Sequence, residues 1–300
     1  MRIRKAREIT EHLWRLGAEE SCVYLLEGSK SSAIISGGMN YIIPDVLRQI
    51  KEFGIDEKKI DHIIILHEHF DHVGIIPFFK RRWPRLTVYA SQRSWDVIAK
   101  PKAIAVINNF SNLVAQQNRD NGDDLSLLDW AWRDDIKGES LAEGDVIDLG
   151  GMKIEIFATP GHSSGSISAY VAQLQALFPS DAAPIPYKDH MVIMPNSNYT
   201  QYQQSLEKLV KFKVKILGAD HYACMVDDEA AHYISNAIAA TREKRSLLEA
   251  LLKKEGSIDQ AAQVYVDEFC KKNPDYFIAP EIMLGVYRQM LKHLAENMAI

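Results

Sequence analysis

Leu66-His67-Glu68-His69-Phe70-Asp71-His72 completes the apolar run Ile-Ile-Ile-Leu of residues 63–66, and such a run is typical of a strand buried on both faces. Residues two apart in an extended chain point to the same side, so His67 and His69 are expected to hold one metal ion together. Asp71 and His72 come where the chain turns, and they can reach a second ion. A solvated charged loop is the alternative, but it does not explain the preceding strand.

Three later residues fit the same plan. His162 stands just beyond a strand expected over 152–157, Asp181 follows the apolar residues 177–178, and His221 follows a strand expected over 213–217. Each lies at the carboxyl end of a strand, where loops gather functional sites. Taken singly, the three also fit as a turn residue, a cap and a core histidine. Together they predict a site whose imidazole and carboxylate groups suit zinc, iron or manganese.

Composition limits the kind of protein. Of the 300 residues, 47% are hydrophobic and 25% are charged, which predicts a globular chain with a buried core. The net charge of −5 argues against a nucleic-acid partner, which usually leaves a basic footprint. No apolar run approaches the ~18 residues of a membrane span. The charged start and three scattered cysteines predict a cytoplasmic location.

Strand and helix patterns alternate along the first three quarters of the chain. Residues 95–119 look helical but contain Pro101, which is expected to break them into two helices. After residue 226 the pattern is helical throughout, with Ser257 as a cap and Pro280 opening the last helix. The sequence therefore predicts a mixed α/β domain over 1–226, with a helical insertion at about 95–137, and a helical extension over 227–300 that covers the active site. Further strands are expected over 22–26, 32–35, 63–66 and 86–90, and helices over 43–53 and 199–212.

The order of these motifs resembles the metallo-β-lactamase family. The run His-x-His-x-Asp-His, then Pro160-Gly161-His162, then Ser180-Asp181, then the turn 218–221 carries the resemblance, which covers about residues 20–225. It implies an α/β (α+β) fold, a four-layer αββα sandwich with the metals at one edge of two facing sheets, here with a C-terminal helical appendage. It also implies that His67, His69 and His162 hold one metal, that Asp71, His72 and His221 hold the other, and that Asp181 bridges them.

Within that family the spacing is similar to a quinolone-signal thioesterase, through Gly37-Gly38, the pattern Asp71-His72-x-Gly-x-x-Pro and the turn 90–93. Two features depart from the wider family. Residues 36–39 read Ser-Gly-Gly-Met where many members carry an aspartate, and Asp220 stands directly before His221. Asp220 is expected either to orient a metal ligand or to cap its turn.

The resulting prediction is a dinuclear metal-dependent hydrolase that uses a metal-bridging hydroxide on a thioester or ester, such as an acyl-coenzyme A. Asp71 and Asp181 are the expected catalytic carboxylates, and His190 is a candidate substrate-binding residue. Two divalent ions are expected, with zinc first and iron or manganese as alternatives. A lactonase, a phosphodiesterase, or a regulatory protein that retains a metal site are the competing functions. The expected partner is a small-molecule substrate, without nucleic acid or membrane, and a homodimer is left open.

Overall fold

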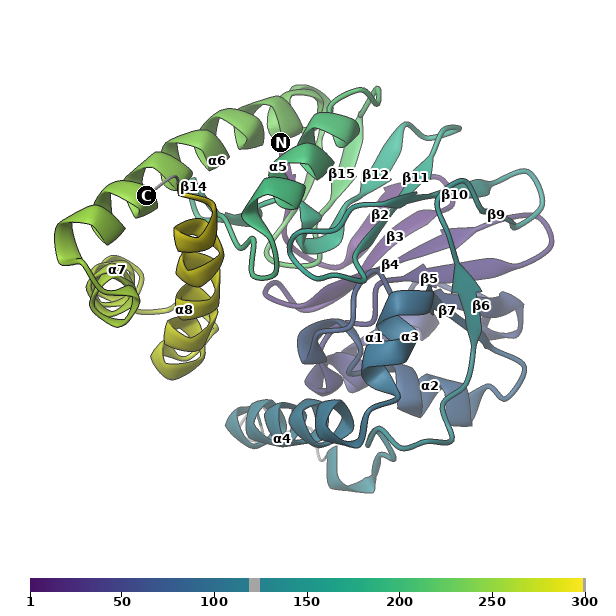
Figure 1. The fold of residues 1–300 in the computed structure, drawn as a ribbon. Coiled ribbons are helices and arrows are strands. Elements are labelled where there is room, and N and C mark those ends of the chain that lie inside the picture. Colours follow the sequence, from purple (N-terminus) through teal and green to yellow (C-terminus); the bar gives the residue numbers. More distant parts are fainter. Residues whose placement is uncertain (119–124, 299–300) are drawn as a thin grey trace.

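Two seven-stranded β-sheets lie face to face in the computed structural model, which describes residues 1–118 and 125–298 (Figure 1). The first sheet has the order β2-β3-β4-β5-β6-β7-β8, and the second has the order β1-β16-β15-β12-β11-β10-β9. A separate hairpin, β13–β14, follows β12. The strands of the first sheet are Arg7–Thr10, Leu13–Gly17, Cys22–Glu27, Ser32–Ile35, Ile60–Ile64, Thr87–Ser91 and Glu139–Leu141. Those of the second sheet, β1, β9–β12, β15 and β16, are Arg2–Ile3, Val146–Asp148, Lys153–Ala158, Ile167–Val171, Ala176–Phe178, Ile216–Gly218 and Cys224–Val226. The hairpin strands are Ile185–Tyr187 and His190–Val192.

The central strands are buried on both faces. Because side chains alternate along a strand, Tyr24 and Leu26 of β4 pack into the layer between the sheets, where they meet Ile154 and Ile156 of β10. The intervening Leu25 belongs to a second apolar cluster on the outer face of the first sheet. This two-sided burial is what the apolar runs of the sequence predict.

Helices cover the outer face of each sheet. Val46 of α1 and Phe79 of α2 pack against the first sheet, and Leu206 of α5 and Tyr233 of α6 pack against the second. The layers therefore follow the order αββα, as predicted. The helices α1 to α5 are Ile43–Glu52, Ile76–Arg82, Gln92–Ile98, Pro101–Gln117 and Tyr199–Leu209. The chain breaks between α3 and α4 at Pro101, which takes the first position of α4.

Three further helices extend from the sandwich (Figure 1). They are α6 Asp227–Glu255, α7 Ile258–Lys272 and α8 Pro280–Asn297. The first half of α6 packs on the second sheet through Tyr233, and its second half joins an apolar cluster with α7, α8 and the β13–β14 hairpin through Leu248 and Leu252. Because α6 packs both on the sandwich and within the C-terminal helical cluster, the division into two domains at residue 226 stays a prediction. Within residues 1–118 and 125–298, no helix combines the length and apolarity that crossing a bilayer requires.

Candidate metal centre

The chain leaves the first sheet immediately before the paired histidines. The strand β6 ends at Ile64, two residues earlier than the sequence predicts. The carbonyl of Leu66 instead accepts a hydrogen bond of 2.8 Å from the amide of Ile167, which lies on β11 of the other sheet. The segment therefore crosses toward the second sheet at this edge. That crossing places His67 in the buried space where loops from both sheets meet.

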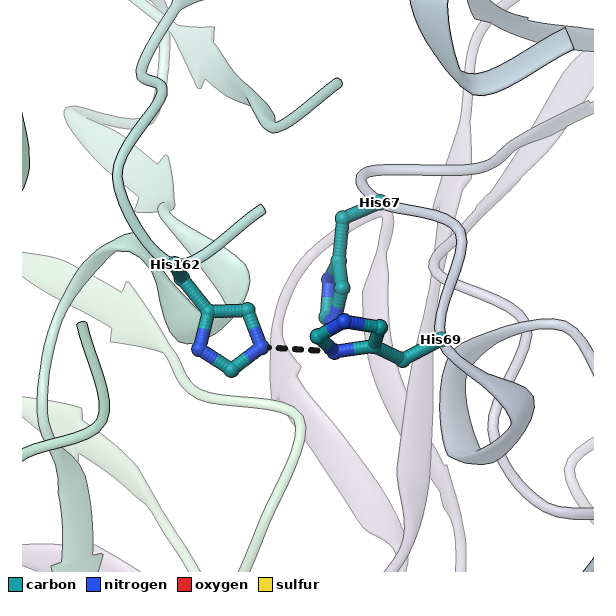
Figure 2. A group of neighbouring side chains, drawn as sticks. All are labelled: His67, His69 and His162. Carbon is teal, nitrogen blue, oxygen red and sulfur yellow. Dashed lines mark hydrogen bonds between the residues drawn. The ribbon is translucent and has the colours of Figure 1, made fainter. Parts of the chain in front are cut away.

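Three histidines form the first group of the centre. The ligand nitrogens of His67, His69 and His162 all lie within 4.8 Å of one another, and Figure 2 shows the three rings converging. The Nε2 atom of His162 lies 2.8 Å from the Nδ1 atom of His69. The Nε2 atom of His67 is buried and has no hydrogen-bond partner among the described residues. Nitrogen lone pairs facing one another in a buried place fit a shared cation.

A second group lies beside the first. Asp71, His72 and His221 also bring their ligand atoms within 4.8 Å of one another, and the Nε2 atoms of His72 and His221 are 3.1 Å apart. Asp181 stands between the groups, with its Oδ2 atom 3.3 Å from Nε2 of His72 and 3.5 Å from Nε2 of His162. All seven residues predicted from the sequence thus meet at one sheet edge. Their arrangement fits two neighbouring cations, with Asp181 placed to contact both.

The outer nitrogens of four histidines are held by other groups. The Nδ1 atoms of His162 and His221 lie 2.6 and 2.7 Å from backbone carbonyls, so both must donate there. Donation from Nδ1 fixes the tautomer and leaves the Nε2 lone pair pointing into the centre. The four partners, for His67, His72, His162 and His221 in turn, are Ser180 Oγ, Asp220 Oδ2, the Met194 carbonyl and the Glu20 carbonyl.

Asp220 orients a candidate ligand. Its Oδ2 atom accepts hydrogen bonds from His72 Nδ1 at 2.9 Å, from Ser36 Oγ at 2.8 Å and from Ser180 Oγ at 2.5 Å. The side chain is 2% exposed. The two possibilities that the sequence left open are therefore decided in favour of orienting His72. Ser36, at the position where many relatives carry an aspartate, supplies one of the three hydrogen bonds.

Burial and charge divide the titrating groups into two kinds. Burial lowers the pKa of His162 to about 4 and the pKa of His67 well below its usual range, so both rings are neutral at pH 7. Burial also acts to lower the pKa of His72, but the carboxylates of Asp181 and Asp71 outweigh it and raise that pKa well above 6.5. Burial acts to raise the pKa of Asp181, but the neighbouring imidazoles outweigh it and keep that pKa lowered. In the metal-free protein, His72 therefore holds a proton.

This difference predicts unequal proton release on metal loading. His67 and His162 are neutral, so the three-histidine group is expected to fill first, without displacing a proton from either of these rings. The second equivalent of zinc must displace the proton of His72, because a ligand nitrogen must be deprotonated. Zinc titration calorimetry at pH 7 in two buffers of different ionisation enthalpy measures the protons released. Equal release for the two equivalents would contradict this assignment.

Glu68 ties together the two segments that carry the three-histidine group. Its Oε2 atom accepts hydrogen bonds from Ser94 Oγ at 2.8 Å and from Ser163 Oγ at 2.9 Å, and its side chain is buried. Glu68 lies between His67 and His69, and Ser163 follows His162. Sequence reasoning missed this role, although the serines at 163, 164 and 166 are a visible signal.

We expect Ser163→Ala to weaken zinc binding about 10-fold or more, which is the usual cost of losing a hydrogen bond that orients a metal site. Chelator competition measures the affinity, and the absorption spectrum of cobalt-loaded protein reports the ligand geometry. Ser31→Ala is the matched control. Ser31 is also buried, but it lies just before the first residue of β5 and its hydroxyl contacts His62, which is not part of the centre. Equal zinc affinities in the two variants would show that the hydrogen bond between Glu68 and Ser163 does not determine the ligand geometry of the centre.

A cavity of about 400 Å³ opens beside the centre. Asp71, Asp181 and His162 border it on one side. Its remaining walls are mainly apolar side chains from α4, such as Ile107 and Phe110, and from the region of α8, such as Ile278, Ile282 and Val286. The C-terminal helices thus contribute part of the wall next to the candidate ligands.

Two other residues lie outside the centre. His190 does not border this cavity; it lies on β14 and lines a different cavity between the hairpin, α6 and α7. Its predicted role in substrate binding stays a prediction, and it would have to act from there. Cys224 is buried on β16 and belongs to none of the ligand groups found among the described residues. Burial raises the pKa of its thiol to about 12.

Two facing sheets with a cluster of histidines and aspartates at one edge define a class of metal-dependent hydrolases. The sequence profile of the metallo-beta-lactamase superfamily matches residues 16–221, and the chain belongs to that superfamily.

Individual relatives are distant. A metallo-beta-lactamase fold-containing protein of Sulfurisphaera tokodaii is 26% identical over 212 residues, which are 68% of this chain and 73% of the relative. The acyl-coenzyme A thioesterase MBLAC2 of Homo sapiens is 24% identical over 213 residues, 63% of this chain and 67% of the relative. A metallo-beta-lactamase family protein from Thermus thermophilus has a similar structure, with a TM-score of 0.67, 16% identity and coverage of 97% of this chain and 95% of that one. The closer likeness to a quinolone-signal thioesterase stays a prediction.

Proposed function

We propose that the protein hydrolyses a thioester or ester whose acyl part is an apolar chain, with two divalent metal ions held by the seven residues of the centre. The observation that carries this proposal is the apolar cavity bordered directly by Asp71, Asp181 and His162. An acyl chain of the substrate lying between α4 and α8 would bring the carbonyl carbon of the substrate to the carboxylates of Asp71 and Asp181. The acyl-coenzyme A thioesterase among the relatives supports this substrate class.

The residues of the chain have distinct roles in this proposal. The seven ligands would hold the ions, which when bound would lower the pKa of a shared water and polarise the carbonyl of the substrate. Asp71 and Asp181 border the cavity as carboxylates that can accept hydrogen bonds from a water and so orient it. Asp220 and the carbonyls behind the histidines keep the ligand nitrogens aimed inward. The apolar walls exclude bulk water from the reacting bond.

The first experiment combines metal analysis of purified protein with a panel of thioester, ester, lactone and phosphodiester substrates. We expect two zinc ions per chain and hydrolysis of the acyl thioesters or esters. Hydrolysis confined to lactones or phosphodiesters would favour those alternatives, with the same residues in the same places. Metal loading without turnover of any member would favour a regulatory protein. Cytoplasmic location, zinc as the native metal and a homodimer belong to the proposal as expectations.

The apolar wall predicts a dependence on chain length. Each buried methylene contributes about 0.8 kcal/mol, which corresponds to about fourfold in kcat/KM. Ile282→Trp should fill the cavity and lower kcat/KM for a decanoyl thioester by about tenfold or more, while an acetyl thioester changes little. A series of acyl-coenzyme A chain lengths measures the effect. Val210→Trp, at an exposed position after α5, is the control. An unchanged series in Ile282→Trp would place the acyl chain elsewhere.

A further inference from the structure

A second cavity, of about 680 Å³, lies among the β13–β14 hairpin, α6 and α7. It shares no lining residue with the cavity at the metal centre. The two are separated by α8, where Val286 faces the metal cavity and the neighbouring Tyr287 contacts the second one through Lys244. The volume lies within the range of small-molecule sites. It is therefore a separate candidate site.

The lining combines an apolar wall with positive charge. Met191, Leu251, Val264 and Phe269 supply apolar surface. Four lysines line the cavity, against two acidic residues, in a chain where acidic residues outnumber basic ones by 40 to 35. Lys188 pairs with Asp275, and Lys254 pairs with Glu255. Within the described parts of the chain, Lys244 and Lys272 make no ion pair. The unpaired positive charge of the cavity therefore lies on these two lysines.

Lys244 is held by aromatic groups in place of a carboxylate. Its Nζ atom donates to the Tyr287 hydroxyl at 2.6 Å, and it lies 4.6 Å from the ring centre of Tyr265 and 4.9 Å from that of Tyr287. The two rings stack at 4.4 Å and are fixed by the helix packing. Aromatic faces attract a cation without neutralising it. The ammonium group is thus fixed in position with its charge available to a ligand.

We propose that this cavity binds an amphipathic anion, with a carboxylate or phosphate monoester head on Lys244 and an apolar chain along Leu251 and Phe269. A charge-assisted hydrogen bond to the ammonium group fixes the head. Burial of the chain against the apolar wall supplies the remaining affinity. His190 lines the same cavity, next to Lys188 and Asp189. The site is independent of the metal centre and of the hydrolysis proposed there.

Calorimetric titration of the 300-residue chain with decanoate tests this site. We expect saturable binding of one molecule that Lys244→Met weakens about tenfold or more, in line with the loss of one charged hydrogen bond. Lys244→Arg should restore most of the affinity. Lys253→Met, at an exposed neighbouring position on α6, should bind as the wild type does. Decyl phosphate distinguishes the two kinds of head group, and 1-decanol should bind far more weakly than either.

The variant Ile282→Trp distinguishes binding of decanoate in the second cavity from binding in the metal cavity. It fills the metal cavity, so binding of decanoate should persist in it if Lys244 is the site. Binding lost in Ile282→Trp but kept in Lys244→Met would place decanoate at the metal centre and overturn the proposal. Absence of saturable binding to the folded wild-type protein, or equal binding of 1-decanol, would overturn it as well. Thermal melting of each variant verifies that it is folded.

Discussion

His69→Ala is expected to lower kcat/KM by about a thousandfold or more, because metal ions supply several kcal/mol of transition-state stabilisation. His69 supplies the Nδ1 atom that faces His162 Nε2 at 2.8 Å, and its loss leaves the first group with two nitrogens. Plasma mass spectrometry of the metal content and kinetics on a decanoyl thioester measure the two effects together. We expect less than two zinc ions per chain and almost no turnover.

His232→Ala is the matched control for this substitution. His232 lies on the exposed side of α6, where its Nδ1 atom lies 2.9 Å from the carbonyl oxygen of Asp228, so its loss should change neither zinc content nor turnover. Full turnover by a His69→Ala protein that has lost metal would refute the hydrolase mechanism. Retention of the biological effect by that protein, with turnover lost, would instead indicate a regulatory function.

Asp220→Ala is expected to lower the free energy of unfolding by about 3 kcal/mol, the lower end of the cost of breaking a buried charged pair. The substitution leaves the donors of His72, Ser36 and Ser180 buried without their acceptor. It also frees the ring of His72 to turn, so activity should fall about 10-fold to 100-fold. Urea denaturation and kcat/KM measure the two effects.

Asp220→Asn refines the test, because the amide keeps the shape and one acceptor oxygen but carries no charge. We expect its loss of stability to be smaller than that of the alanine variant. Its activity should lie between those of the alanine variant and the wild type. A change below about 1 kcal/mol in Asp220→Ala, typical of an exposed ion pair, would mean that the hydrogen bonds of Asp220 do not support the fold.

Much of the fold follows from local patterns. The strands at 22–26 and 32–35 and the helix starting at Ile43 are found where the apolar runs and the proline indicate them. The cap Ser257 also accepts the expected hydrogen bond, from the amide of Gln260. These features depend on residues close in sequence, so local patterns are enough to predict them.

The differences arise from contacts between distant residues. The strand expected to end at Leu66 ends at Ile64, because the carbonyl of Leu66 bonds to the other sheet. Beyond the turn at His221 the chain pairs back onto β15 as β16, a strand that the local sequence pattern does not predict. The strands β8, β13, β14 and β16 have three residues each, which is too short for a periodic pattern to show. Of the predicted helical insertion at about 95–137, residues 119–124 lie outside the described residues.

The residues that meet in the candidate site could be predicted from the sequence, but the groups that support them could not. Histidine and aspartate can be recognised by residue type and spacing, and all seven predicted ligands meet. The groups behind them are different. Two are backbone carbonyls, of Glu20 and Met194, which no residue type reveals. The role of Glu68 depends on Ser94 and Ser163, which lie far from it in sequence.

The candidate ligands of the centre come from loops of both sheets. His67, His69, Asp71 and His72 follow β6 of the first sheet, whereas His162, Asp181 and His221 follow strands of the second. Ions bound there would cross-link the two halves of the sandwich, much as a disulfide would, and binding energy would become folding energy. Metal supply would then govern the lifetime of the folded chain as well as its chemistry. In a chain without metal, the two sheets would separate first at this edge.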